Sequence, residues 1–201
     1  MLLSVLLSRW GVACGDKFQS NDGRIKIRIC VSRIRMRPTR LDGKFHYTTD
    51  AWPRTLLLEV DMLGDVAERF RCRSDSVQGH VKDHGNELAS EYDTTYNGGH
   101  VAGARSGGPS EEINTVTMLE EVNQYLVDSQ LESYKMFEED IAANPENFRN
   151  LVVEFKYPEP AGPEFTPADK VPTKFIAAWN DASGKSMRRR FENVPAGKGG
   201  Q

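Results

Sequence analysis

The chain has 201 residues, 38% of them hydrophobic, which is enough apolar material for one domain with a core and excludes an intrinsically disordered chain. Its three cysteines show no CxxC spacing, which excludes a disulfide framework and a zinc knuckle and indicates reduced thiols. The formal net charge is −3, but charge is unevenly distributed along the chain. Residues 1–60 contain 11 Lys/Arg and 5 Asp/Glu, residues 61–169 contain 8 and 22, and residues 170–201 contain 7 and 2. We therefore expect charge pairing within the protein or partners of both signs.

The first 22 residues are predicted to be an N-terminal extension. Its apolar run, within "MLLSVLLSRW", is about seven residues long and too short to span a bilayer, and we expect no transmembrane segment elsewhere. Leucines, serines and one arginine precede the first acid, Asp16, a composition typical of a short mitochondrial presequence. The alternative is an ordinary apolar strand or helix, with a cytoplasmic protein.

Residues 24–31 alternate strictly between apolar and polar side chains and predict a half-buried strand. The alternation slips by one residue afterwards, so we expect a β-bulge near Ser32 or Arg33. Further strands are predicted at 45–48, 56–62 and 66–73, the last two as an antiparallel hairpin. From 74 to 110 the periodicity disappears and glycines accumulate, which predicts a long loop that is flexible or ordered by a partner.

A helix is predicted from Ser110 to about Ala143, either continuous or broken near Ser129. Ser110 is a suitable N-cap, Glu111 and Glu112 follow it, and apolar residues then recur at helical spacing. A strand at 151–157 follows, and residues 158–201 are predicted to be a Pro-rich arm with a basic tail. We therefore predict an α+β domain over 23–157, in which a small antiparallel sheet packs with one long acidic amphipathic helix, plus the extended C-terminal arm.

Basic residues gather on the predicted strands and tail, with too few acids opposite them to pair within the sheet. They are either partly neutralised by the acidic helix or covered by an acidic protein or RNA, which would be bound through its phosphates. The predicted partner- or polyanion-binding residues are Arg24, Lys26, Arg28, Arg33, Arg35, Arg37, Arg69, Arg71, Arg73, Arg188, Arg189 and Arg190.

His80, His84 and Glu87 are candidate metal ligands, with Asp93 and His100 as additional ligands from the loop. No apolar periodicity supports a helix there, and we favour solvated loop histidines and predict no cofactor. "ASGKS", residues 182–186, matches only the end of a phosphate-binding loop and is interpreted as a surface turn.

Since the usual enzyme motifs are missing, the sequence favours a non-catalytic accessory or scaffolding subunit. Segregated charge, a Gly-rich loop and a Pro-rich arm suit a subunit of a mitochondrial multiprotein assembly, such as a respiratory or ATP-synthase-type complex. The alternatives are an RNA-binding structural subunit of a ribonucleoprotein of the mitochondrial-ribosome type and, third, a small metal-dependent enzyme.

Overall fold

The computed structural model describes residues 18–19, 25–26, 37–41, 44–62, 74–160 and 164–195, and the chain divides into two units, 1–34 and 35–201. In the first unit, β1 (Phe18–Gln19) and β2 (Ile25–Lys26) pair antiparallel, with Phe18 opposite Lys26. The predicted strand over 24–31 is thus described only at Ile25 and Lys26. The predicted bulge after it lies outside the described residues.

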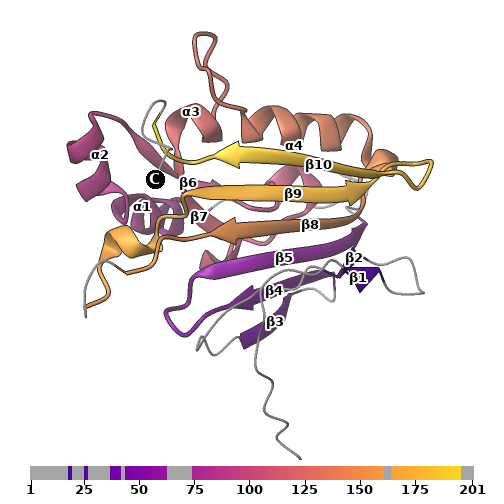
Figure 1. The fold of residues 1–201 in the computed structure, drawn as a ribbon, viewed down its shortest axis with the longest axis horizontal. Helices are drawn as coiled ribbons and strands as arrows, with labels where there is room; N and C mark the ends of the chain where they lie inside the picture. The colour runs from indigo at the N-terminus through magenta and orange to yellow at the C-terminus, as the bar shows by residue number, and fades with distance from the viewer. Residues whose placement is uncertain are drawn as a thin grey trace, which may run out of the picture. The chain divides into compact units, whose positions relative to one another are not determined.

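The second unit is built on a six-stranded antiparallel sheet (Figure 1). Its strands run in the order β10-β9-β8-β5-β4-β3. They are β3 (Arg37–Leu41), β4 (Phe45–Thr49), β5 (Thr55–Met62), β8 (Arg149–Lys156), β9 (Lys174–Asn180) and β10 (Ser186–Glu192). The α+β class, the antiparallel sheet and three predicted strands, now β4, β5 and β8, are confirmed. The partner predicted for β5 at 66–73 lies outside the described residues.

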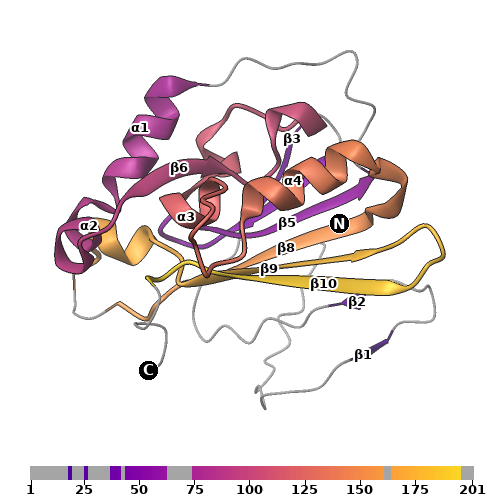
Figure 2. The same cartoon turned by 90° about the horizontal axis from the view of Figure 1, so that it is seen from above.

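Between the neighbouring strands β5 and β8 the chain makes a long insertion that covers one face of the sheet (Figures 1 and 2). Its elements are α1 (Asp75–Asp83), α2 (Asn86–Tyr92), β6 (Tyr96–His100), β7 (Thr115–Leu119), α3 (Glu120–Asn123) and α4 (Tyr134–Ala143). Strands β6 and β7 form a separate antiparallel ribbon in which His100 lies opposite Thr115.

The core lies between this insertion and the sheet. Tyr134 and Phe137 of α4 pack on Phe175 of β9 and Phe191 of β10, with ring centroids 5.0–5.6 Å apart. All four side chains are at most 2% exposed. These aromatic contacts fix α4 against the sheet.

The prediction of one long acidic helix is wrong. Residues 115–119 form strand β7, α3 is only four residues long, and α4 begins at Tyr134. Apolar residues three apart suggested a helix, but every residue of β7 is buried, so the strand has no polar face that would produce alternation. Tertiary pairing with β6 decides the outcome here.

The prediction of a long loop over 74–110 is also wrong, because α1, α2 and β6 lie within it. Ser74 caps α1, because its side chain accepts a hydrogen bond from the N–H of Val77 at 3.4 Å. The helix is mostly polar, and Val81 is its one buried residue. An apolar stripe was therefore absent from the sequence. The hydroxyl of Thr117 donates to the carbonyl of Val81 at 2.7 Å and fastens the end of α1 to β7.

The prediction of an extended, basic C-terminal arm is wrong for its described part. Strands β9 and β10 form a hairpin at one edge of the sheet, joined by the turn at 181–185, where the N–H of Asp181 donates to the carbonyl of Lys185. The interpretation of "ASGKS" as a turn is confirmed. Three consecutive arginines in β10 masked an alternation in which Met187, Arg189 and Phe191 face the core. Among the described residues, no helix is long and apolar enough to cross a membrane.

Candidate active site

The predicted basic binding surface lies largely outside the described residues and stays a prediction. Seven of its cations lie outside them: Arg24, Arg28, Arg33, Arg35, Arg69, Arg71 and Arg73. Lys26 belongs to β2 of the first unit, and Arg37 is exposed on the edge strand β3.

The arginines of β10 are divided between the two faces of the sheet. Arg188 and Arg190 are exposed, and Arg190 contacts Glu192 of its own strand. Arg189 points to the helical layer, where its guanidinium pairs with Asp140 at 2.9 Å and Glu132 at 3.5 Å. It also lies 5.3 Å from the ring centroid of Phe137. Arg189 therefore stabilises α4 on the sheet and is not a free binding residue.

The histidines proposed as metal ligands are brought together without a third ligand. His80 lies on α1 and His84 caps it, with ring centroids 5.1 Å apart, whereas Glu87 is on α2. The carboxylate nearest His80 is that of Glu112, at 3.8 Å. Within the described part of the chain no group of three or more His, Cys, Asp or Glu is arranged to hold a metal ion.

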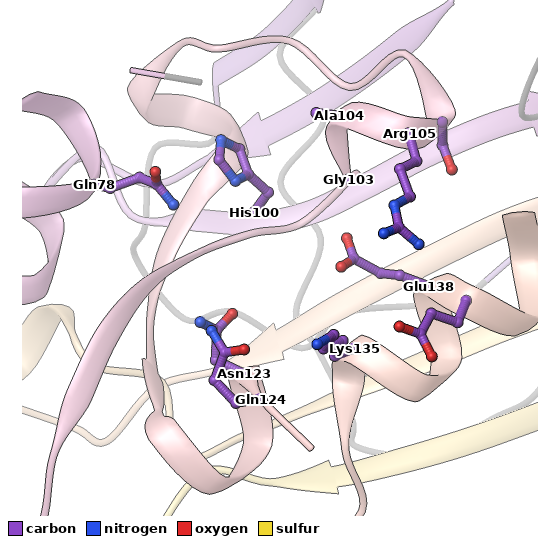
Figure 3. Close-up of a pocket in the computed structure, with 11 residues that line it drawn as sticks. Gln78, His100, Gly103, Ala104, Arg105, Asn123, Gln124, Lys135 and Glu138 are labelled. Atoms are coloured by element: carbon purple, nitrogen blue, oxygen red, sulfur yellow. The ribbon is translucent and has the colours of Figure 1, made fainter. Parts of the chain in front are cut away.

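A cavity of about 250 Å³ is present elsewhere in the insertion, where α1, β6, α3 and α4 meet the loop that follows β6 (Figure 3). Most of its lining residues are polar, and they include one histidine, two amides of α3 and its following turn, two cations and two carboxylates. The lining residues are Gln78, His100, Gly103, Ala104, Arg105, Ser106, Asn123, Gln124, Lys135, Glu138 and Glu139.

His100 ends strand β6 and is 9% exposed. The two residues before it are glycines, and each leaves room for a neighbour. A Cβ at Gly99 would lie 2.6 Å from Oδ1 of Asn123, closer than real Cβ contacts allow. At Gly98 the space is taken by the backbone of Gln78, whose side-chain amide donates to the Gly98 carbonyl at 3.0 Å. The glycines thus bring α1 and α3 close to the strand that carries the histidine.

Asn123 is supplied by α3, which starts directly after β7. The N–H of Glu120 donates to the carbonyl of Thr95 at 2.8 Å, and Val122 is fully buried. From the far side, Asn193 accepts the N–H of Leu119 at 2.7 Å and donates to the carbonyls of Thr117 and Pro172. The position of Asn123 is therefore fixed by contacts on both sides of the ribbon.

Helix α4 supplies Lys135 and Glu138 to the same cavity. Its N-terminus is capped by Ser133, and the hydroxyl of Tyr134 donates to the carbonyl of Val101 at 2.6 Å. Burial, followed by the charge of Glu138, raises the pKa of Tyr134 well above its usual value, so this phenol stays protonated. A Cβ at Gly103 would meet the Glu138 carboxylate, with its Cδ only 3.0 Å away. Arg105 extends from the same loop toward Glu138 (Figure 3).

The loop bearing Gly103 and Arg105 is held by one buried amide, that of Asn114. Its Oδ1 accepts the Tyr47 hydroxyl at 2.7 Å and the Ala102 N–H at 2.8 Å. Its Nδ2 donates to the carbonyls of Ala102 and Pro109, at 2.9 and 2.7 Å. Asn114 therefore uses all of its side-chain hydrogen-bonding capacity to fix the wall of the cavity to strand β4.

The sequence pointed to His100 only as an additional loop ligand, and it missed Asn123 and Glu138. Asp93, proposed alongside His100, instead caps α2 in a left-handed conformation. The pattern that could have indicated the site is "NGGH", in which two glycines precede a histidine, followed at a distance by an asparagine and a glutamate. No protein-family model matches the chain, and no curated protein matches it.

Proposed function

We propose that the protein is a metal-dependent hydrolase that acts on phosphodiesters, and specifically a nuclease. The observation that carries the proposal is the convergence of His100, Asn123 and Glu138 on one cavity, at positions kept open by Gly99 and Gly103. A histidine, two oxygen ligands and two cations in one polar cavity form a set of groups suited to hydrolysing a phosphate ester.

Asn123 and Glu138 are the residues that would hold the metal. An amide oxygen and a carboxylate are hard ligands, and Mg²⁺ commonly takes only one or two protein ligands and fills its remaining positions with water and substrate phosphate. Few ligands from the chain therefore suffice for Mg²⁺, whereas a structural zinc site would need four. When bound, Mg²⁺ would neutralise the charge that develops on the phosphate and on the leaving oxygen.

His100 is the general base of this proposal. A histidine side chain accepts protons near neutral pH. It takes a proton from water as the water oxygen bonds to phosphorus; the bond from phosphorus to the leaving oxygen breaks, and that oxygen takes a proton from a second water. Arg105 and Lys135 contribute positive charge, which binds the anionic phosphate and stabilises it as negative charge shifts.

The size of the cavity favours a large substrate. At about 250 Å³ it lies below the 300–1,000 Å³ or so that is usual for pockets enclosing whole small ligands. One phosphate group with its metal and water fits inside, and the remainder of the substrate would lie along the surface. A nucleic acid has this form, since it offers many equivalent phosphodiesters on a long chain.

The test is cleavage of supercoiled plasmid, single-stranded DNA and RNA by the full chain in Mg²⁺ and in EDTA. We expect cleavage that EDTA abolishes and that His100→Ala lowers by about 10²–10⁴-fold. His46→Ala is the matched control, because His46 is exposed on β4 and pairs in register with Glu59, away from the cavity. Failure to cleave all three substrates, or equal rates for His100→Ala and the native chain, would refute the proposal.

The variant Asn123→Ala tests the metal ligand separately from the general base, His100. We expect it to raise the Mg²⁺ concentration needed for half-maximal cleavage, whereas His100→Ala should lower the rate at saturating Mg²⁺. The accessory-subunit function predicted from the sequence, its mitochondrial location and its protein partners stay predictions. RNA, named there as a second partner, is among the substrates of the test.

A further inference from the structure

A second cavity of about 470 Å³ lies between α1, β7 and the strands β3 to β5 of the sheet. It shares no lining residue with the candidate active site. Its charged lining is Arg37, Arg54, His84 and Lys170, opposed by the single carboxylate of Glu112. We propose that this cavity binds a small phosphate monoester, as the free ester or as the phosphorylated end of a nucleic acid.

The first argument is an unsatisfied hydroxyl. Thr115, which lines the cavity, is 5% exposed, and its Oγ1 has no hydrogen-bond partner among the described residues. A buried hydroxyl without a partner costs about 1–3 kcal/mol, so such groups call for a ligand or water. The neighbouring hydroxyls are already used, since Thr55 donates to the carbonyl of Ile113 and Thr117 to that of Val81.

The second argument is the distribution of charge. Arg54 already has partners: its Nε donates to Asp50 at 2.7 Å, and its NH1 donates to the carbonyl of Asp169 at 2.9 Å. Arg37 and Lys170, in contrast, form no ion pair with any described residue. Two such cations around a hydroxyl-lined cavity, against one carboxylate, favour an anion with several acceptor oxygens.

The charge of Lys170 also acts on His84, which lines the same cavity. Its pKa is lowered, first by burial and then by the charge of Lys170. An anion bound in the cavity would offset the positive charge of Lys170 and raise the pKa of His84 again. The cavity is also large enough for more than inorganic phosphate, since it falls within the size range of small-ligand pockets.

The experiment follows the His84 ring signals by NMR in the full chain, in EDTA and without divalent metal, so that hydrolysis at the first cavity plays no part. The probes are inorganic phosphate, a 5′-mononucleotide, and one oligonucleotide with and without a 5′-phosphate. We expect a saturable shift and a raised His84 pKa with the phosphate monoesters. The mononucleotide and the 5′-phosphorylated oligonucleotide distinguish the free ester from a nucleic-acid end.

Two variants test the groups named above. Lys170→Glu should weaken binding at least tenfold, and Thr115→Val, which keeps the shape of the side chain, about fivefold. Lys82→Glu is the matched control, because Lys82 is an exposed residue of α1 outside the cavity lining. The inference is overturned if no probe gives a saturable shift at 10 mM or so, or if Lys170→Glu binds as tightly as Lys82→Glu. It does not depend on the proposed nuclease activity, which the His100→Ala assay tests separately.

Discussion

Gly103→Ala is the sharpest test of how the candidate active site is held open. Gly103 has φ −62° and ψ 151°, an extended conformation that alanine adopts without strain. Any effect of the substitution must therefore come from the added methyl group. The three atoms nearest to that Cβ all belong to the side-chain carboxyl group of Glu138.

The displacement follows from the distances. The Cβ would lie 3.0 Å from Cδ of Glu138, whereas ordinary contact begins at 3.4 Å, so the carboxyl group must retreat by at least 3.4 − 3.0 = 0.4 Å, and its nearer oxygen by more. A misplacement of about 1 Å at a reacting centre can cost about 10²-fold in rate. We expect kcat/KM to fall about 10- to 100-fold, or about 1.4–2.7 kcal/mol of transition-state stabilisation.

The assay is Mg²⁺-dependent plasmid cleavage, with thermal unfolding measured in parallel. Gly79→Ala is the matched control, because a Cβ at Gly79 would meet nothing within 4 Å beyond its chain neighbours and the backbone of its own helix, and the residue is exposed on α1. It should keep full activity and be more stable by about 0.5–1 kcal/mol. If Gly103→Ala cleaves within twofold of the native rate, the Glu138 carboxylate has no role at the reacting centre. If it instead unfolds, the glycine serves stability.

Three further predictions concern the support of the candidate active site by Asn114, the buried Tyr96 of β6, and His84 of the second cavity. Asn114→Ala should lower the free energy of unfolding in urea by about 3–5 kcal/mol, because it leaves buried donors and acceptors of the loop unpaired; a loss under 1 kcal/mol would contradict this. Burial raises the pKa of Tyr96 to about 12. The contribution of Tyr96 to stability is therefore fully present below pH 10 and lost as the pH rises from 10 to about 12. Over that range the urea midpoint of Tyr96→Phe should fall less than that of the native chain. The pKa of His84 is lowered, so its contribution is present above pH 6.5 and lost as the pH falls below it; Lys170→Met should raise that pKa in an NMR titration, and an unchanged value would exclude the coupling.

Strands β4 and β5 could be predicted because each has one buried and one more exposed face. In β4, Phe45 and Tyr47 are buried while His46 is exposed, and β5 alternates in the same way at Leu58, Glu59 and Val60. Such alternation is visible in the sequence without knowledge of the partner strand.

The ribbon and its helices could not be predicted for the opposite reason. Strand β6 contains Gly98 and Gly99, which are poor strand formers, and β7 is buried on both faces, so neither alternates. A Cβ at Gly98 would meet the backbone of Gln78, and one at Gly99 would meet Met118 of β7 and Asn123, so both positions need glycine for close approach. The region where local sequence preference fails is thus the region of the candidate site, which is where such conflicts are expected.

The sheet and the candidate site are joined by a small number of polar ties. Tyr47 of β4 holds Asn114 and with it the loop of Arg105; Asn193, which follows β10, holds β7 in front of α3; and Arg189 of β10 holds α4 through Asp140. The loop of Arg105, α3 and α4 form three walls of the cavity. Each is held by a contact from β4, from β10 or from the residue after β10, and neither strand contributes a residue to the cavity lining. It follows that Tyr47, Asn193 and Arg189 influence the site as positioning residues. Their replacement should disturb the cavity through geometry, with the sheet transmitting the change.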